Sequence, residues 1–233
     1  MTLHIKGDII IIPERTFYSC ESLTKITIPH SITSIGRYSF KNCYSLESVT
    51  IPPSVTTIGY YAFENCSSLT EIIIPSSVSK IENNAFSYCS SLTEIKIPSS
   101  VSEIGDSAFS DCSSLEEIEI SPSITKINNR VFYHCSSLKR IFIPSSVQSI
   151  GFDAFRECNS LEEIKISSSI IKMDSCAFAD CSSLSQVSIL SSEIYFGDNA
   201  FSCCKKLKEI YVPYSAKIKE SYSYPSKKTI IRK

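Results

Sequence analysis

Phenylalanine recurs every 23 residues along this chain, with no insertion or deletion. A constant step of this kind constrains the fold strongly, because every repeat must form the same short unit and cover its apolar side chains with its neighbours. The column consists of Phe17, Phe40, Phe63, Phe86, Phe109, Phe132, Phe155, Phe178 and Phe201. The chain is therefore expected to be a linear array of repeats.

Each repeat carries further apolar residues at constant distances from its phenylalanine. In one repeat Cys112 and Leu115 follow Phe109, and the alternating pair Ile118 and Ile120 comes next. Alternation with period two predicts a short strand that points both isoleucines to one face. A proline follows this strand in most repeats and is expected to end its hydrogen-bond ladder. A Val-x-x-Ile pair predicts a second extended segment in each coil.

The remainder of the repeat predicts a bend and then a helical turn. A glycine column should adopt positive φ, and Asp or Asn just after it resembles a helix N-cap. The spacing Ala-Phe-x-x-Cys-x-x-Leu is typical of one or two helical turns. The bend column is Gly36, Gly59, Gly105, Gly151 and Gly197, with Asn128 and Asp174 in equivalent places, and the cap candidates are Asp106, Asn129 and Asp198.

These patterns predict a solenoid of about nine 23-residue coils over residues 1–213. Residues 214–233 form a basic tail, either flexible or folded over the last coil. Neither end shows a clear polar cap, which favours end-to-end self-association. In the eighth coil Glu193 interrupts the valine column, so this coil should be distorted, with Ile194 and Phe196 pointing inward.

The consensus L-x-x-I-x-I-P-x-S-V-x-x-I-G-x-x-A-F-x-x-C-x-S, cleanest in residues 63–120, resembles the BspA-like leucine-rich repeat. The resemblance implies a leucine-rich repeat solenoid whose coils each hold a short strand, a second extended segment and a helical turn. Family members are surface antigens of certain bacteria and parasitic protists that bind host matrix proteins or other microbes. The resemblance thus implies adhesion or recognition at a cell surface or after secretion, and no reaction.

The outward positions of the Ile-x-Ile strands vary most, as expected of a binding face on a constant scaffold. Aromatic and aliphatic residues there would anchor a protein or glycan partner, and the glutamates would select a basic one. The alternative is that exposed positions drift and that the charges are merely solvated. The candidate partner-binding residues are Glu71, Ile73, Glu94, Lys96, Glu117, Glu119, Arg140, Phe142, Glu163, Lys165 and Tyr211.

The cysteines allow three interpretations. Nine of the eleven share one inward-facing column, which favours buried free thiols that behave as small apolar residues. Disulfides between adjacent coils are compatible with the spacing but cannot pair an odd column completely. Metal binding is disfavoured, because no Cys-x-x-Cys pair exists and the only histidines are His4, His30 and His134. Cys176 and Cys203 lie outside the column and are expected to be oxidisable.

Other function classes find little support. The net charge of -1 argues against nucleic-acid binding. The chain shows no apolar run long enough for a membrane span and no signal-peptide pattern at its start. It also lacks a nucleotide loop, a metalloprotease motif and a nucleophile elbow, so neither catalysis nor a cofactor is expected. The leading hypothesis is a non-enzymatic adhesion module, and the alternative is an intracellular leucine-rich repeat scaffold or regulatory adaptor. A catalytic subunit would need a pocket of converging polar groups.

Overall fold

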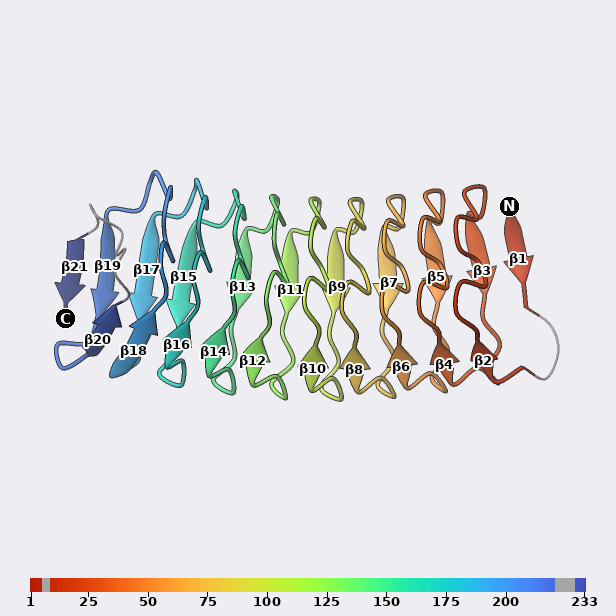
Figure 1. The fold of residues 1–233 in the computed structure, drawn as a ribbon, viewed down its shortest axis with the longest axis horizontal. Helices are drawn as coiled ribbons and strands as arrows, with labels where there is room; N and C mark the ends of the chain where they lie inside the picture. Colours follow the sequence, from red (N-terminus) through yellow and green to blue (C-terminus); the bar gives the residue numbers. More distant parts are fainter. Residues whose placement is uncertain (6–8, 221–228) are drawn as a thin grey trace.

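The computed structural model describes residues 1–5, 9–220 and 229–233. Two ladders of parallel strands run side by side along the long axis of the molecule (Figure 1). The odd-numbered ladder contains β1 (Thr2–His4), β3 (Lys25–Thr27), β5 (Ser48–Thr50), β7 (Glu71–Ile73), β9 (Glu94–Lys96), β11 (Glu117–Glu119), β13 (Arg140–Phe142), β15 (Glu163–Ile166), β17 (Gln186–Ile189), β19 (Glu209–Val212) and β21 (Thr229–Arg232). The even-numbered ladder contains β2 (Ile11–Ile12), β4 (Ser34–Ile35), β6 (Thr57–Ile58), β8 (Lys80–Ile81), β10 (Glu103–Ile104), β12 (Lys126–Ile127), β14 (Ser149–Ile150), β16 (Lys172–Met173), β18 (Glu193–Phe196) and β20 (Lys217–Glu220).

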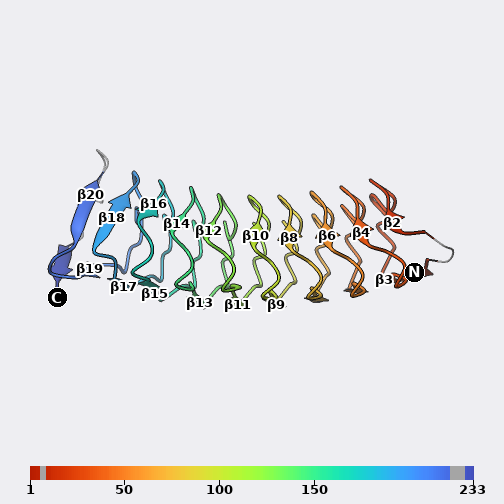
Figure 2. The same cartoon turned by 90° about the horizontal axis from the view of Figure 1, so that it is seen from below.

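Each coil contributes one strand to each ladder, and equivalent residues of neighbouring coils are in register. Ile118, for example, pairs with Ile95 on one side and Ile141 on the other. A shift by one residue would turn the isoleucines out of the core, so the apolar alternation determines this register. Figure 2, turned by 90°, shows the coils stacked one after another like rungs. The expected solenoid of stacked 23-residue coils is confirmed.

The core is a set of continuous stacks of identical side chains. The phenylalanine rings form one stack, with neighbouring centroids 4.9–5.9 Å apart and interplanar angles of 1–17°. From Phe40 to Phe201 each ring is at most 1% exposed. Burial of one such side chain is worth roughly 1.5–3 kcal/mol, and only neighbouring coils can supply it.

The cysteine column forms a second stack. All eleven cysteines are free, and those from Cys43 to Cys204 in the column are buried. Each of these thiols donates a hydrogen bond to the carbonyl oxygen of the phenylalanine in the preceding coil, at 3.0–3.2 Å. Burial raises the pKa of the Cys66 and Cys112 thiols well above its ordinary value. These thiols are therefore held in the protonated, unreactive form.

The segment expected to be helical consists of consecutive turns instead, and no helix occurs in residues 9–220. Two residues of each coil adopt φ of 55–64°, as Tyr38 and Asn42 do. Their N–H groups donate to carbonyls of the next coil, Tyr60 at 2.9 Å and Glu64 at 2.9 Å. A helix would bond these groups within the segment, so hydrogen bonding between coils replaces helical bonding.

The cap candidates also act between coils. Asp106 Oδ1 accepts the N–H of Asn129 at 3.0 Å, and Asn129 Oδ1 accepts the N–H of Phe152 at 3.0 Å. Each side chain thus satisfies a donor one coil further on. The caps predicted for helices at Asp106 and Asn129 are therefore caps of the neighbouring coil.

The expectation that the glycine column adopts positive φ is also wrong. None of its five glycines adopts a left-handed φ. A Cβ on Gly105 would instead lie 2.5 Å from the backbone N of Asn83, and one on Gly36 would lie 2.6 Å from the carbonyl oxygen of Ile12. At these five glycines the preceding coil lies too close for a Cβ to be added without a shift, whereas Asn128 and Asp174 occupy the equivalent position in two other coils.

Each ladder has one interruption. The even ladder is interrupted between β10 and β12, where Asn128 replaces glycine and its Nδ2 bonds to the carbonyl of Ile104 at 2.7 Å. In the fourth and sixth coils the backbone N–H of Gly105 and of Gly151 makes the equivalent bond at 2.8 Å. The odd ladder is interrupted between β13 and β15. This second interruption falls on the face that carries the candidate residues.

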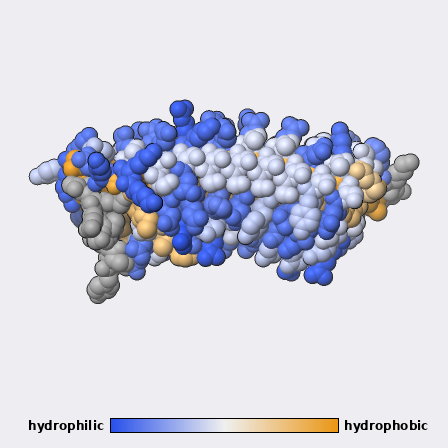
Figure 3. Space-filling view, turned by 90° about the horizontal axis from the view of Figure 1, so that it is seen from above, coloured by the Kyte–Doolittle hydropathy of each residue, from blue (hydrophilic) through white to orange (hydrophobic). Residues whose placement is uncertain are grey.

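The two ends differ from the regular coils. In the eighth coil Ile194 and Phe196 are buried within β18, which confirms their expected inward orientation. Of the segment 214–233, β20 pairs with β18 and β21 pairs with β19. The N-terminal coil exposes Ile10 and Ile11. Apolar colour gathers near both ends of an otherwise hydrophilic surface in Figure 3.

Candidate partner-binding face

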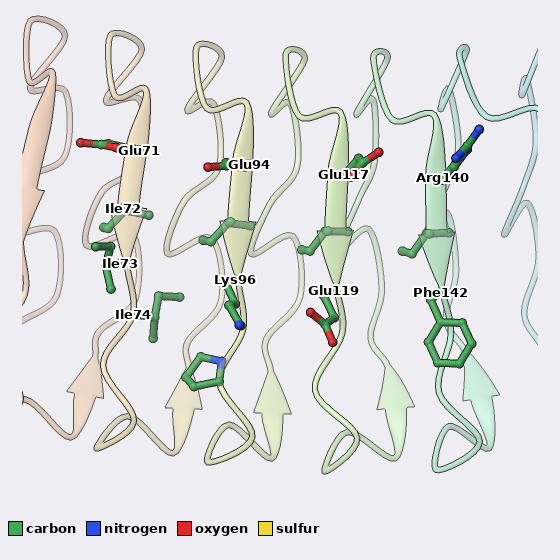
Figure 4. Close-up of a pocket in the computed structure, with 14 residues that line it drawn as sticks. Glu71, Ile72, Ile73, Ile74, Glu94, Lys96, Glu117, Glu119, Arg140 and Phe142 are labelled. Atoms are coloured by element: carbon green, nitrogen blue, oxygen red, sulfur yellow. The ribbon is translucent and has the colours of Figure 1, made fainter.

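The odd-numbered ladder presents two rows of outward side chains. In each three-residue strand the middle residue points to the core and its two neighbours point outward. We call the outward residues that begin these strands the first row and those two positions later the second row. Figure 4 shows both rows across β7 to β13. The first row there is Glu71, Glu94, Glu117 and Arg140, and the second is Ile73, Lys96, Glu119 and Phe142.

A groove of about 820 Å³ runs along these four strands. The residues that line it are those of both outward rows, together with Ile74, Pro98 and the inner strand residues Ile72, Ile95, Ile118 and Ile141. Ile73 and Phe142 stand at its two ends and are 77% and 72% exposed. Isolated exposed apolar residues are common on proteins, but two of them flanking an apolar groove form a surface suited to a partner.

The charged groups of this groove are unpaired. Glu119 is in register with Lys96, and Glu117 with Arg140. None of these four side chains forms an ion pair with any other part of the described chain. Glu94 and Glu117 lie side by side, an arrangement that destabilises a sheet through like-charge repulsion. The arrangement of charges on this face therefore does not stabilise the isolated chain.

Charges on the turn segments behave differently. Asp153 is 1% exposed, and its carboxylate lies 3.2 Å from Arg130 and 3.8 Å from Arg156. His134 lies 2.8 Å from Asp111. The chain thus pairs its charges along the turn segments and leaves those of the groove available to solvent.

A second groove of about 630 Å³ continues the first across the interruption in the odd ladder. Arg140, Ile141 and Phe142 line both grooves, so the two grooves meet at β13. The second groove brings in Glu163 and Lys165, as well as Leu190, which is 47% exposed. Leu190 stands where most repeats have proline, and no sequence pattern marked it as a candidate for this face.

Tyr211 has a different environment from Ile73 and Phe142. Its hydroxyl donates to Glu209 at 2.7 Å, and the Nζ of Lys233 lies 3.9 Å from its ring centroid. The hydrogen bond to Glu209 raises the pKa of Tyr211. Glu116, next to the candidate Glu117 in sequence, likewise pairs with Lys139 at 2.7 Å. The structure brings together the candidates from Glu71 to Lys165, and Tyr211 lies further along the ladder with contacts of its own.

Neither a metal cluster nor a membrane-spanning helix emerges from the described residues. They hold no group of three or more His, Cys, Asp or Glu side chains placed to bind a metal ion. No helix among them is long and apolar enough to cross a bilayer.

A parallel solenoid built from 23-residue coils with an outward strand face is an architecture that leucine-rich repeat proteins adopt. The chain belongs to the BspA type leucine rich repeat family, whose model matches residues 10–139 and 125–231 in six copies. The resemblance drawn from the repeat consensus is thereby confirmed.

Solved structures agree with this assignment. A leucine-rich repeat protein from Bacteroides ovatus is 26% identical, with a TM-score of 0.73, over 99% of this chain and 70% of that one. The T. pallidum leucine rich repeat protein is 28% identical, with a TM-score of 0.65, over 69% of this chain and 77% of that one. No curated protein sequence matches the chain.

Proposed function

We propose that this chain is a non-enzymatic protein-binding module that holds its partner on the outward face of the odd-numbered ladder. The observation that carries the proposal is the continuous groove over β7–β17, flanked by exposed apolar side chains and lined by unpaired charges. Aromatic and aliphatic anchors surrounded by polar residues are typical of protein interfaces. The backbone of these strands is already ordered in hydrogen-bonded ladders, which lowers the ordering cost of binding.

The interface of this proposal centres on Phe142, because this residue belongs to both grooves. The test uses binders selected from a random peptide library against the parent chain. The double variant Ile73→Ala/Phe142→Ala should weaken their binding at least tenfold, as expected for loss of interface anchors. Its Tm should stay close to that of the parent, since both side chains are exposed in the free chain.

A matched control removes an aliphatic and an aromatic side chain elsewhere. Ile171 and Tyr88 are 59% and 50% exposed and line neither groove. Binders selected from a random peptide library against the parent chain should bind Ile171→Ala/Tyr88→Ala with unchanged affinity. If the binders have the same affinity for Ile73→Ala/Phe142→Ala as for the control variant, recognition occurs elsewhere on the chain. That result would overturn the proposal.

An adhesion role at a cell surface is the finer part of the proposal. It rests on the resemblance to BspA-like surface antigens and on the family membership. Antibody labelling of intact cells should detect the full-length product. Labelling that appears only after permeabilisation would overturn the adhesion role and favour an intracellular scaffold or regulatory adaptor with the same binding face.

A further inference from the structure

We propose that the occupant of the groove over β7–β13 is an extended polypeptide segment with the pattern apolar-x-basic-x-apolar. This inference rests on the proposed function and adds the chemistry of the partner. It follows from three properties of the groove: its length, its apolar ends and its charge.

The length of the groove sets the spacing of the two apolar residues. Ile73 and Phe142 are separated by three strand-to-strand steps, from β7 through β9 and β11 to β13. At about 4.8 Å a step this amounts to about 14 Å. In an extended chain every second side chain faces the same way, about 6.8 Å apart. Residues i and i+4 of an extended segment therefore lie about 14 Å apart and fit both ends.

The charge of the groove selects the residue between them. Four carboxylates, Glu71, Glu94, Glu117 and Glu119, line it against the two cations Lys96 and Arg140, a net charge of -2. Lys96 and Glu119 of the second row lie directly between the apolar ends, and Glu94 and Glu117 of the first row begin the same two strands, β9 and β11, two residues away. Residue i+2 of the segment would lie over these strands. A lysine or arginine there lies beside Glu119, and its long side chain extends towards the neighbouring carboxylates of Glu94 and Glu117, whereas an acidic residue increases their repulsion.

The main chain of the segment would run across the strands, and β7, β9 and β11 supply no unpaired backbone groups to it. Every strand from β7 to β11 already bonds to a neighbour on each side. Recognition must therefore come from side chains in the groove. This makes affinity sensitive to the order of residues in the segment and to salt.

Three fluorescent peptides with identical Gly-Ser flanks test the inference by fluorescence anisotropy. The first has the centre Leu-Ser-Arg-Ser-Leu, the second replaces Arg with Glu, and the third is Leu-Ser-Arg-Leu-Ser, which shortens the apolar spacing. The first should bind at least tenfold more tightly than either of the others, and its affinity should fall as salt rises. Equal affinity of the first and second peptides would overturn the requirement for a basic residue. Equal affinity of the first and third peptides would overturn the requirement for the apolar spacing.

A pair of charge variants separates the groove from the rest of the surface. Glu94→Gln/Glu117→Gln should weaken the first peptide at least fivefold and reduce its preference over the second. The control Glu14→Gln/Glu21→Gln removes the same charge from exposed sites outside the groove and should leave both affinities unchanged. Equal losses in both variants would mean that the peptide responds to overall charge only, and would overturn the inference.

The outcomes distinguish this inference from the proposed function. If all three peptides bind equally and Ile73→Ala/Phe142→Ala abolishes binding, the face is a binding site but the pattern is wrong. If neutral oligosaccharides bind at Phe142 and none of the peptides does, a polypeptide occupant is excluded. If binding of the first peptide survives Ile73→Ala/Phe142→Ala, neither proposal holds for this face.

Discussion

The thiol of Cys112 donates a hydrogen bond to the backbone carbonyl oxygen of Phe86, at an Sγ–O distance of 3.2 Å. The same carbonyl accepts the N–H of Cys89 at 3.3 Å within its own coil. The carbonyl of Phe86 thus accepts one hydrogen bond from its own coil and one from the next coil. This double role gives a reason for cysteine at a position where another small apolar residue would also fit the core.

Replacement of Cys112 by alanine should lower the free energy of unfolding by about 1–2 kcal/mol, because a buried hydrogen bond and part of the core packing are lost. The exposed Cys203 provides the control, and Cys203→Ala should change stability by less than about 0.5 kcal/mol. Urea unfolding measures both variants. Equal destabilisation would contradict a role for the buried thiol.

Thiol labelling should follow burial. Cys203 is exposed and should react first in the native protein, with the partly buried Cys20 and Cys176 slower. The eight buried cysteines should react only after unfolding. Mass spectrometry of alkylated peptides assigns each rate. Rapid alkylation of Cys112 in the folded chain would show that the coils open locally.

Stability should fall at alkaline pH. Burial raises the pKa of Cys43 to about 12 and that of Cys66, Cys89 and Cys112 well above the ordinary value. A raised folded pKa contributes stability that is complete below the unfolded pKa of about 8.5 and is lost as pH rises towards the folded one.

Each such thiol should remove about 1.4 kcal/mol per pH unit in this window. Urea unfolding at several pH values between about 8 and 10.5 measures the slope. The Cys112→Ala variant should show a shallower slope, since one titrating group is absent. A free energy of unfolding that stays constant over this range would refute the expectation.

Gly105→Ala should destabilise the array by about 1–3 kcal/mol, because the added Cβ meets backbone atoms of the preceding coil, which cannot rotate away. Thermal unfolding detects the change. Ser76→Ala, at an exposed position, provides the comparison and should stay within about 0.5 kcal/mol of the parent. An unaltered Tm for Gly105→Ala would mean that neighbouring coils can separate at little cost.

The sequence by itself determined the repeat length, the apolar columns and the strand register. Phe109 and Ile118 recur at one step along the chain, and only stacking in register buries every copy. The same reasoning predicted the inward orientation of Ile194 and Phe196 in the irregular coil. These features follow from the chemical type of each side chain, which is visible without coordinates.

The tertiary structure alone decided the course of the turns and the state of the binding face. Left-handed φ occurs at residues as different as Tyr38 and His134, because hydrogen bonds to the next coil stabilise it and residue type does not reveal it. Phe142 stays open, whereas Lys233 contacts the ring of Tyr211. Both residues hold the same position in their repeats, so only contacts between distant parts of the chain distinguish them.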